Sequence, residues 1–289
     1  MARIVRGACR TQRPRARLAR MQMSIDPEPI ESTPVPPAQA RLEERALSRR
    51  WFYPYRLPSG RITPTSEGAA VDAIHHTRLR MLDAELARTF GDRCDGLSAI
   101  DLACHQGWFA AHLAQRGFAS VLGVDARAEH ITDATLMRDL LELRKLAYLQ
   151  SDVHALDVGA LGTHDLVLCF GLIYHLENPV GALRMARALC RKLCLIETQI
   201  APGLSGWIDY GNHQYVRPLQ GSFGVIDETA ETHGPEASTT GICLVPSLDA
   251  LLWILRKIGF DRVEVLPVPT DGYEQLLHHK RVMLAAWVD

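Results

Sequence analysis

Short apolar runs alternate with longer segments of helical spacing across the middle of the chain. The apolar runs lie at about 98–103, 120–125, 146–150, 164–170 and 193–198, and each has the length of a buried strand. Between them, helical patterns fall at about 107–117, 128–143 and 178–190. A crossover between parallel strands needs a covering helix. The alternation therefore predicts an α/β, doubly wound fold with a mostly parallel sheet.

The segment before the first apolar run has a helical pattern of its own. Residues 38–50 predict a short charged helix, and WFYPYRLPSGRITPT is aromatic and rich in turn formers. EGAAVDAIHHTRLRMLDAELARTF carries apolar residues at helical spacing. We therefore expect residues 41–96 to form a helical extension on the substrate side. His75, His76 and Arg78 of this helix belong either to a site or to an ordinary polar stripe.

Charge is distributed unevenly. Residues 1–20 carry seven arginines and no acid, and the proline-rich DPEPIESTPVPP follows, so residues 1–40 read as a disordered tail. A targeting peptide, a nucleic-acid arm, or a true start near Met21 or Met23 are alternatives; the tail lacks the apolar core of a secretory signal. Because the whole chain carries −1 and residues 1–20 carry +7, residues 21–289 carry −8. An acidic body makes nucleic acid an unlikely partner.

Composition narrows the class further. The 289 residues, 47% of them hydrophobic, suit one large domain with an extension. The longest apolar stretches, such as LVLCFGLI, fall well short of the roughly 20 residues that span a bilayer, so no membrane anchor is expected. The seven cysteines lack paired CxxC spacing, which favours a reducing cytoplasm over disulfides and gives no reason to expect a metal.

Acidic residues end three of the predicted strands, at Asp101, Asp125 and Asp152. A fourth strand opens into FGLIYHLENP, where Asn178 and Pro179 suit a helix start. All four loops fall at the carboxyl edge of one sheet, where doubly wound folds bind ligands, and an acid after the second strand suits ribose hydroxyls. Ala103 and His105 stand where a dinucleotide-binding turn has glycine, which argues against an NAD-dependent oxidoreductase.

These motifs resemble the class I S-adenosylmethionine-dependent methyltransferases: DLACHQG, LGVDA, SDV and FGLIYHLENP in order, followed by CLVPSLDALLWILRKIGFDRVEVL. The resemblance implies a seven-stranded Rossmann-like sheet over residues 97–289, with an insertion at 199–245 after the fifth strand. It implies S-adenosylmethionine as cofactor, with ribose on Asp125, adenine near Asp152, and the methionine end against residues 101–107. The predicted cofactor-binding residues are Asp101, Ala103, Cys104, His105, Gly107, Asp125, Ala126, Asp152, Val153, Phe170 and Gly171.

Within this family the fourth motif is most similar to the branch that carboxymethylates wobble uridine in tRNA with carboxy-S-adenosylmethionine. That branch uses a tyrosine, matched here by Tyr174, toward the extra carboxylate. A lysine upstream of the first loop would be its cationic partner, but the first lysine here is Lys145. We therefore expect methylation of a small-molecule acceptor, on oxygen or nitrogen. A carboxymethylating enzyme and a non-catalytic module with this fold are the alternatives, and the presence of all three strand-end acids disfavours the module.

Two residues of the fourth loop are the candidate catalytic residues. His175 follows the fourth strand, and an imidazole titrates near neutrality, so it suits a general base. A histidine that caps or packs the loop is the alternative. Tyr174 either lies along the cofactor or belongs to the core. His105 likewise either contacts the methionine carboxylate or packs the loop.

Acceptor recognition is expected from parts outside the common fold. The aromatic segment before the first long helix and the long connection after the fifth strand both carry ring side chains, and long insertions often form binding loops. A surface excursion that buries its aromatic residues is the alternative for the insertion. The candidate recognition residues are Trp51, Phe52, Tyr53, Tyr55, Trp207, Tyr210, His213, Tyr215 and Arg217.

Overall fold

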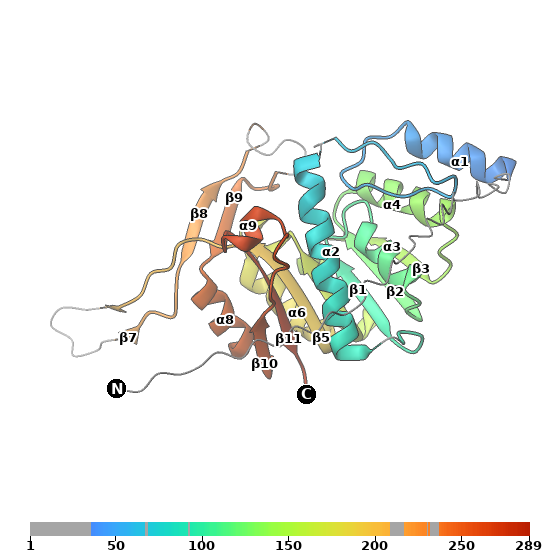
Figure 1. Ribbon diagram of the computed structural model, residues 1–289. Coiled ribbons are helices and arrows are strands. Elements are labelled where there is room, and N and C mark those ends of the chain that lie inside the picture. The colour runs from blue at the N-terminus through green and yellow to red at the C-terminus, as the bar shows by residue number, and fades with distance from the viewer. Residues whose placement is uncertain (1–35, 67–68, 92, 209–216, 230, 232–236) are drawn as a thin grey trace, which may run out of the picture. The chain divides into compact units, whose positions relative to one another are not determined.

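A seven-stranded sheet organises the chain, in the strand order β10-β11-β5-β4-β1-β2-β3 (Figure 1). Strand β11 runs antiparallel to both neighbours, and the other adjacent pairs are parallel, which confirms the doubly wound, mostly parallel fold. The strands are β1 (Ser98–Leu102), β2 (Ser120–Asp125), β3 (Leu146–Gln150), β4 (His164–Phe170), β5 (Cys190–Gln199), β10 (Arg262–Val265) and β11 (Arg281–Trp287).

This computed structural model describes residues 36–66, 69–91, 93–208, 217–229, 231 and 237–289. The predicted tail therefore lies almost wholly outside the described residues, and so do Tyr210, His213 and Tyr215. Helix α1 (Pro37–Leu47) begins inside the last residues that we assigned to the tail. The boundaries at 40, 96 and 245 stay predictions. No described helix combines the length and the apolar character needed to cross a membrane.

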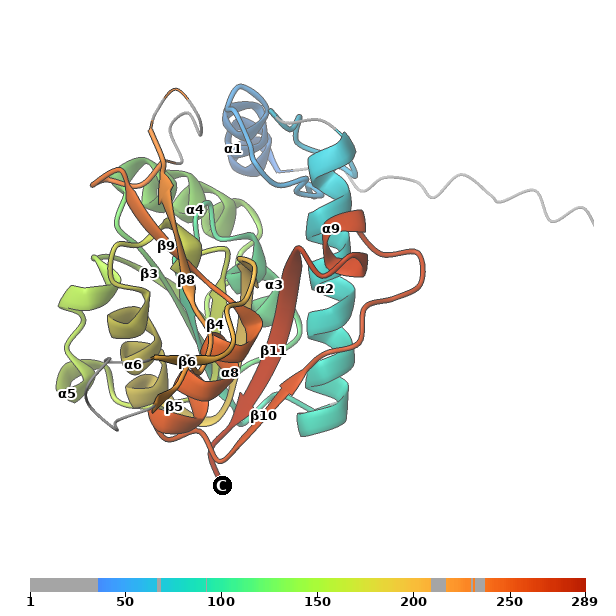
Figure 2. The same ribbon diagram turned by 90° about the vertical axis from the view of Figure 1, so that its left-hand side faces the viewer.

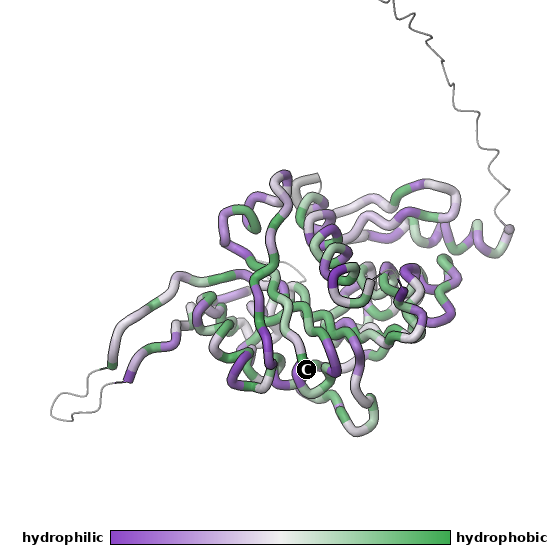
Figure 3. The backbone as a smooth tube through the Cα atoms, turned by 60° about the horizontal axis from the view of Figure 1, so that its bottom comes forward, coloured by the Kyte–Doolittle hydropathy of each residue, from purple (hydrophilic) through white to green (hydrophobic). Residues whose placement is uncertain are grey.

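Helices cover both faces of the sheet (Figure 2). On one face, α2 (Ala69–Phe90), α3 (Trp108–Gln115) and α4 (Ala128–Leu140) pack over a core that includes Leu82 and Phe109. On the other, α6 (Pro179–Leu189) and α8 (Leu248–Lys257) pack over a core that includes Leu183 and Leu255. Hydrophobic residues follow the central strands, whereas the helices alternate in hydropathy (Figure 3). Two short helices, α5 (Val158–Leu161) and α9 (Glu274–Leu277), complete the described set with α1.

Local sequence explains where the helices begin. The Asn178 side chain accepts a hydrogen bond from Gly181 N, and Pro179 occupies the first turn of α6, as predicted. Ser247 caps α8 by accepting from Ala250 N. Gly107 precedes α3 with φ of +82°, and a Cβ there would collide with the hydroxyl of Tyr148. Glycine is therefore required where the first loop turns into α3.

The insertion after β5 contains two antiparallel ribbons. One joins β6 (Trp207–Ile208) to β7 (Arg217–Pro218), and the other joins β8 (Phe223–Asp227) to β9 (Ile242–Pro246). Strand β9 packs against the short turn η2 (Ile173–His175) that follows β4, and Leu244 N donates to Leu176 O at 3.0 Å. The described part of the insertion is thus attached beside the fourth loop.

The aromatic segment before α2, which we expected to recognise the acceptor, is largely buried. Trp51, Tyr53 and Tyr55 are buried in the core, and Phe52 packs on His105. Phe52 N donates to Gln106 Oε1 at 2.8 Å, and Tyr55 Oη donates to Gln106 O at 2.8 Å. The aromatic rings are largely apolar, so packing beside α3 removes them from water. The segment therefore contacts the first loop through Gln106 and His105.

Candidate functional site

The first loop, between β1 and α3, holds two non-glycine residues in the left-handed region. Ala103 has φ of 58° and His105 has φ of 54°, a conformation that costs a non-glycine residue roughly 1–3 kcal/mol. Hydrogen bonds compensate, because Cys104 N donates to Val124 O at 2.8 Å and His105 N donates to Asp125 Oδ2 at 2.9 Å. The loop is thus bent as a glycine-rich turn would be, with side chains in place of glycine.

Asp125, at the end of β2, is heavily engaged. Besides the bond from His105 N, it accepts from Arg127 N at 2.9 Å, and His130 Nδ1 lies 3.1 Å from Oδ1. Burial acts to raise the pKa of Asp125, but the hydrogen bond and charge of His130, together with the backbone bonds from Arg127 and His105, hold the pKa below its usual value. The His105 and His130 rings stack with centroids 3.8 Å apart. His105 therefore packs the loop beside Asp125.

Asp101, at the end of β1, has a pKa shift opposite in direction to that of Asp125. Its side chain is buried, and Oδ2 has no hydrogen-bond partner among the described residues. Burial, with the nearby charge of Asp125, raises the pKa of Asp101 to about 8. An uncompensated carboxyl group of this kind is ready to pair with a cationic ligand group.

The remaining predicted cofactor-binding residues differ in how far their side chains are exposed to solvent. The side chain of Asp152 is 62% exposed and accepts from His154 N at 2.7 Å, so it caps the short turn η1 (Val153–Ala155). The Ala126 carbonyl accepts from Gln150 Nε2, at the same edge. By contrast, the Cys104 side chain is buried beneath the loop against Gly123. Only the backbone of Cys104 is therefore left for a ligand.

The end of β4 lies over a buried cationic group. Phe170 packs edge-to-face on Phe109, and Gly171 follows with φ of 68°. A Cβ on Gly171 would lie 3.7 Å from Tyr174 Oη and 3.9 Å from an Arg78 nitrogen. Gly171 thus lies between the end of β4 and the buried side chains of Tyr174 and Arg78.

We call Arg78, Glu197 and Arg281 the arginine cluster. Arg78 lies 2.7 Å from Glu197 Oε2, and Arg281 Nε donates to Glu197 Oε1 at 2.6 Å, with all three side chains buried. Burial acts to raise the pKa of Glu197, but the charges of Arg281 and Arg78 hold it below its usual value. Two guanidinium groups around one carboxylate leave a net charge of +1. Arg78 Nε has no hydrogen-bond partner among the described residues.

Tyr174 is joined to the arginine cluster. Its hydroxyl accepts from Arg281 at 2.9 Å, and the Arg281 guanidinium lies over the Tyr174 ring, 4.7 Å from its centroid. The Tyr174 ring also lies 4.1 Å from that of His175. The two candidate catalytic residues thus lie side by side, and the cation that contacts Tyr174 is Arg281 rather than a lysine upstream of the first loop.

His175 is paired with a carboxylate from the insertion. Its Nδ1 lies 2.8 Å from Oε1 and 2.7 Å from Oε2 of Glu228, which directly follows β8. The His175 side chain is 20% exposed and the Glu228 side chain only 3%. An imidazole held by a buried carboxylate is an arrangement suited to proton transfer.

Several residues of this edge were missed or misread from sequence. Glu197 interrupts the apolar run LCLIETQ and Arg281 begins the apolar RVMLAAW, so a charge next to a buried strand was the available signal. His75 and Arg78 are buried, so they do not form an exposed polar stripe, and burial lowers the pKa of His75 to about 2. No local pattern identified Glu228 as a partner of His175.

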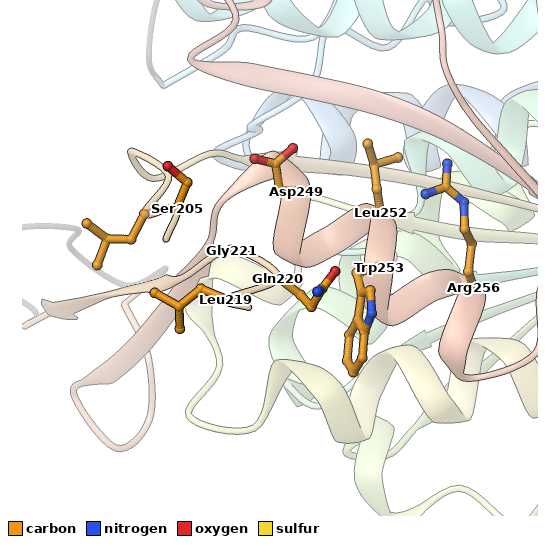
Figure 4. A pocket seen from close by; sticks show the side chains of 9 residues that line it. Ser205, Leu219, Gln220, Gly221, Asp249, Leu252, Trp253 and Arg256 are labelled. Atoms are coloured by element: carbon orange, nitrogen blue, oxygen red, sulfur yellow. The ribbon is translucent and has the colours of Figure 1, made fainter. Parts of the chain in front are cut away.

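A separate hollow of about 280 Å³ lies between the insertion and α8 (Figure 4). Its lining includes Leu219, Asp249, Trp253 and Arg256, and none of the predicted site residues. Trp207, expected to recognise the acceptor, is 65% exposed, and Arg217 is exposed as well. Across the described ranges, no group of three or more His, Cys, Asp or Glu side chains is arranged to hold a metal ion.

Comparison with known proteins gives one family match. Residues 74–265 match the family described as "Methyltransferase domain". A ubiquinone biosynthesis O-methyltransferase from Acinetobacter baylyi is 24% identical over 170 residues, which is 59% of this chain and 60% of that protein. A tRNA U34 carboxymethyltransferase from Trichodesmium erythraeum is 28% identical over 105 residues, covering 36% of this chain and 32% of that protein.

Solved structures share the fold. The N-terminal domain of EvdMO1, crystallised with SAH bound, aligns with a TM-score of 0.63 at 21% identity, covering 87% of this chain and 96% of that one. Magnesium protoporphyrin IX methyltransferase from Synechocystis PCC 6803, with bound SAH, aligns with a TM-score of 0.51 at 16% identity, covering 78% of this chain and 90% of that one.

Proposed function

Because the chain belongs to the methyltransferase domain family, we propose that it transfers a methyl group from S-adenosylmethionine to a small molecule with a protic acceptor, a hydroxyl or a protonated amine. The observation that carries this proposal is the His175–Glu228 pair beside the end of β4. Methyl transfer to a protic acceptor needs an orienting site that excludes water and a group that removes a proton.

The first half of the sheet edge fits the cofactor. Asp101 presents a buried carboxyl oxygen without a described partner, suited to the cofactor's positive charge. Asp125 has three hydrogen bonds to its two oxygens, and a carboxylate has about four acceptor sites, so a ribose hydroxyl can still donate to it. S-adenosylmethionine supplies an electrophilic methyl group on its sulfonium sulfur. The chain's task is to hold the acceptor in line and to take its proton.

Binding and turnover test this function separately. We expect S-adenosylmethionine and S-adenosylhomocysteine to bind in calorimetry and NAD to give no heat. Transfer of tritiated methyl is then measured to catechol and 3,4-dihydroxybenzoate as hydroxyl acceptors and to phenethylamine as an amine. Binding of NAD in place of both sulfur compounds would reject the proposal.

His175→Ala is the decisive variant. We expect turnover to fall about 10²- to 10⁴-fold, the usual contribution of a general base, with S-adenosylhomocysteine affinity nearly unchanged. His164→Gln, at the opposite end of β4, is the matched control and should retain both. Equal losses of affinity and of rate in His175→Ala would make His175 a structural residue of the loop.

A second candidate is carboxymethyl transfer from carboxy-S-adenosylmethionine, and the arginine cluster favours it. A buried net charge of +1 beside Tyr174 suits an added carboxylate better than a bare sulfonium. The similarity to tRNA U34 carboxymethyltransferases supports the same reading. Calorimetry decides between the two cofactors: tighter binding of carboxy-S-adenosylmethionine than of S-adenosylmethionine would select this candidate.

A further inference from the structure

Glu228 belongs to the insertion after β5, and its side chain contacts the fourth loop, which follows β4. It directly follows β8 in the insertion, and both of its carboxylate oxygens lie within 2.8 Å of His175 Nδ1. Two further bonds fix its direction, since Ser238 N donates to Oε2 at 2.8 Å and Cys243 Sγ donates to Oε2 at 3.3 Å. The carboxylate is therefore held by the insertion and aimed at the imidazole.

This contact determines which nitrogen of His175 carries the proton. Burial acts to raise the pKa of Glu228, but hydrogen bonding and charge from His175, with the Ser238 and Cys243 bonds, hold it below its usual value. Glu228 is thus ionised near neutrality and can only accept hydrogen bonds. In the neutral imidazole, Nδ1 of His175 then carries the proton and Nε2 keeps the lone pair.

We propose that Glu228 is a positioning residue that holds His175 with its basic nitrogen, Nε2, directed to the acceptor, so that the insertion completes the base. This inference rests on the proposed methyl transfer to a protic acceptor. The acceptor atom forms a bond to the methyl carbon while the carbon–sulfur bond breaks and its electron pair leaves with sulfur. The acceptor's proton moves to Nε2, and the imidazolium that results is stabilised by the Glu228 carboxylate.

Attachment of the insertion supports the same conclusion. Leu244 N donates to Leu176 O, one residue beyond His175, and Cys243 on the same strand donates to Glu228. The hairpin that carries Glu228 is therefore fixed to the loop that carries His175 by backbone as well as by side chain. A shift of this hairpin would change the orientation of the base.

Nitrogen-15 NMR of the full chain with labelled histidine tests the positioning without any acceptor. The His175 signals are assigned from their loss in His175→Gln. We expect one tautomer, protonated at Nδ1, in the wild type and in Glu228→Gln, because a glutamine oxygen still accepts the bond. Glu228→Ala should give a mixture of tautomers. Glu231→Gln, an exposed glutamate of the same insertion, should keep the wild-type signals.

Kinetics with the acceptor that the wild type methylates give the second readout. Glu228→Gln should lower kcat about 10- to 100-fold, a part of the general-base contribution, with KM and S-adenosylhomocysteine affinity changed less than about twofold. Glu231→Gln should have no effect. Unchanged tautomers in Glu228→Ala, or unchanged kcat in Glu228→Gln, would overturn the inference. If His175→Ala is also fully active, the proposed base itself is wrong, which separates the two failures.

Discussion

The carboxyl edge of the sheet has two halves with opposite electrostatics. After β1 and β2, the buried groups are carboxyls, Asp101 and Asp125, and their partners are largely backbone N–H groups. After β4 and β5, the buried groups are the arginine cluster, where two guanidinium groups surround Glu197. A ligand lying along this edge therefore meets negative charge at one half and positive charge at the other.

The halves also differ in how they are assembled. The first uses residues within one stretch, 101–152, whose order along the chain is the order along the sheet. The second joins α2, β5 and β11, so that Arg281 and Arg78 reach Glu197 from opposite ends of the sequence. A local arrangement tolerates single losses better, because backbone donors remain in place. In an arrangement of buried charges, the loss of any one member leaves another charge buried without its partner, which is strongly destabilising.

The largest effect is expected from Glu197→Ala, which breaks the second half. Removing the carboxylate leaves two buried guanidinium groups without a counter-charge, which costs about 3–5 kcal/mol of unfolding free energy. Urea denaturation measures it. Glu264→Ala removes a glutamate that is 41% exposed and paired with Arg88, and should cost under about 1 kcal/mol. Equal small losses for both would mean that the arginine cluster is not a linked unit.

Asp101→Asn should change stability in a pH-dependent way. The folded pKa of Asp101, about 8, lies above its ordinary value of 3.8, so folding favours its protonated form. Its stabilising contribution is present at low pH and is lost as the pH rises through 8. Asparagine stays neutral, so the variant should gain on the wild type between pH 4 and pH 9, on the order of a few kcal/mol at the upper end.

Asp165→Asn provides the control of opposite sign. Burial acts to raise the pKa of Asp165, but bonds from Arg191, Ser98 and Lys192 hold it at about 2, so its ionised form is stabilising above pH 3.8. This variant should lose stability relative to wild type as the pH rises from 2 to 4. Urea denaturation of Asp101→Asn at pH 6 and 9 and of Asp165→Asn at pH 2 and 4 shows the contrast, and a flat difference for Asp101→Asn would reject the raised pKa.

The same contrast explains what could be predicted from sequence. Strands β1 to β4 and helices α3, α4 and α6 were found because each of these strands is a short apolar run and each of these helices has helical spacing, whereas the four-residue α5 was missed. Asp101 and Asp125 were singled out because each follows an apolar run at a strand end, and Gly107 because it closes the turn before a helix. The arginine cluster and Glu228 could not be paired from sequence, because their partners are set by tertiary contacts. The burial of Tyr53 and Tyr55 could not be predicted, because buried aromatic residues and ligand-facing ones share one local pattern.

Asp125→Ala tests the first half by ligand affinity. If ribose hydroxyls use the remaining acceptor site of Asp125, the variant should bind S-adenosylhomocysteine more weakly by roughly 1–3 kcal/mol, the cost of leaving polar partners unpaired. Calorimetry measures the change at a temperature where the variant is folded. Asp139→Ala, on the same helix as His130 but 50% exposed, should bind normally. Unchanged affinity for Asp125→Ala would place the ribose elsewhere.

The smallest effect is expected from Asp152→Ala, at the outer end of the first half. Its carboxylate is 62% exposed and already accepts from His154 N, so a bond to the adenine amine is screened by water and partly replaced by it. We expect the affinity for S-adenosylhomocysteine to fall by less than about 1 kcal/mol, comparable to the loss of an N-terminal cap. Asp157→Ala removes the equivalent cap of α5, where Asp157 accepts from Gly159 N, and controls for the cap alone. A loss in Asp152→Ala larger than that in Asp125→Ala would reverse the order proposed for this half, because an exposed carboxylate would then contribute more than a buried one.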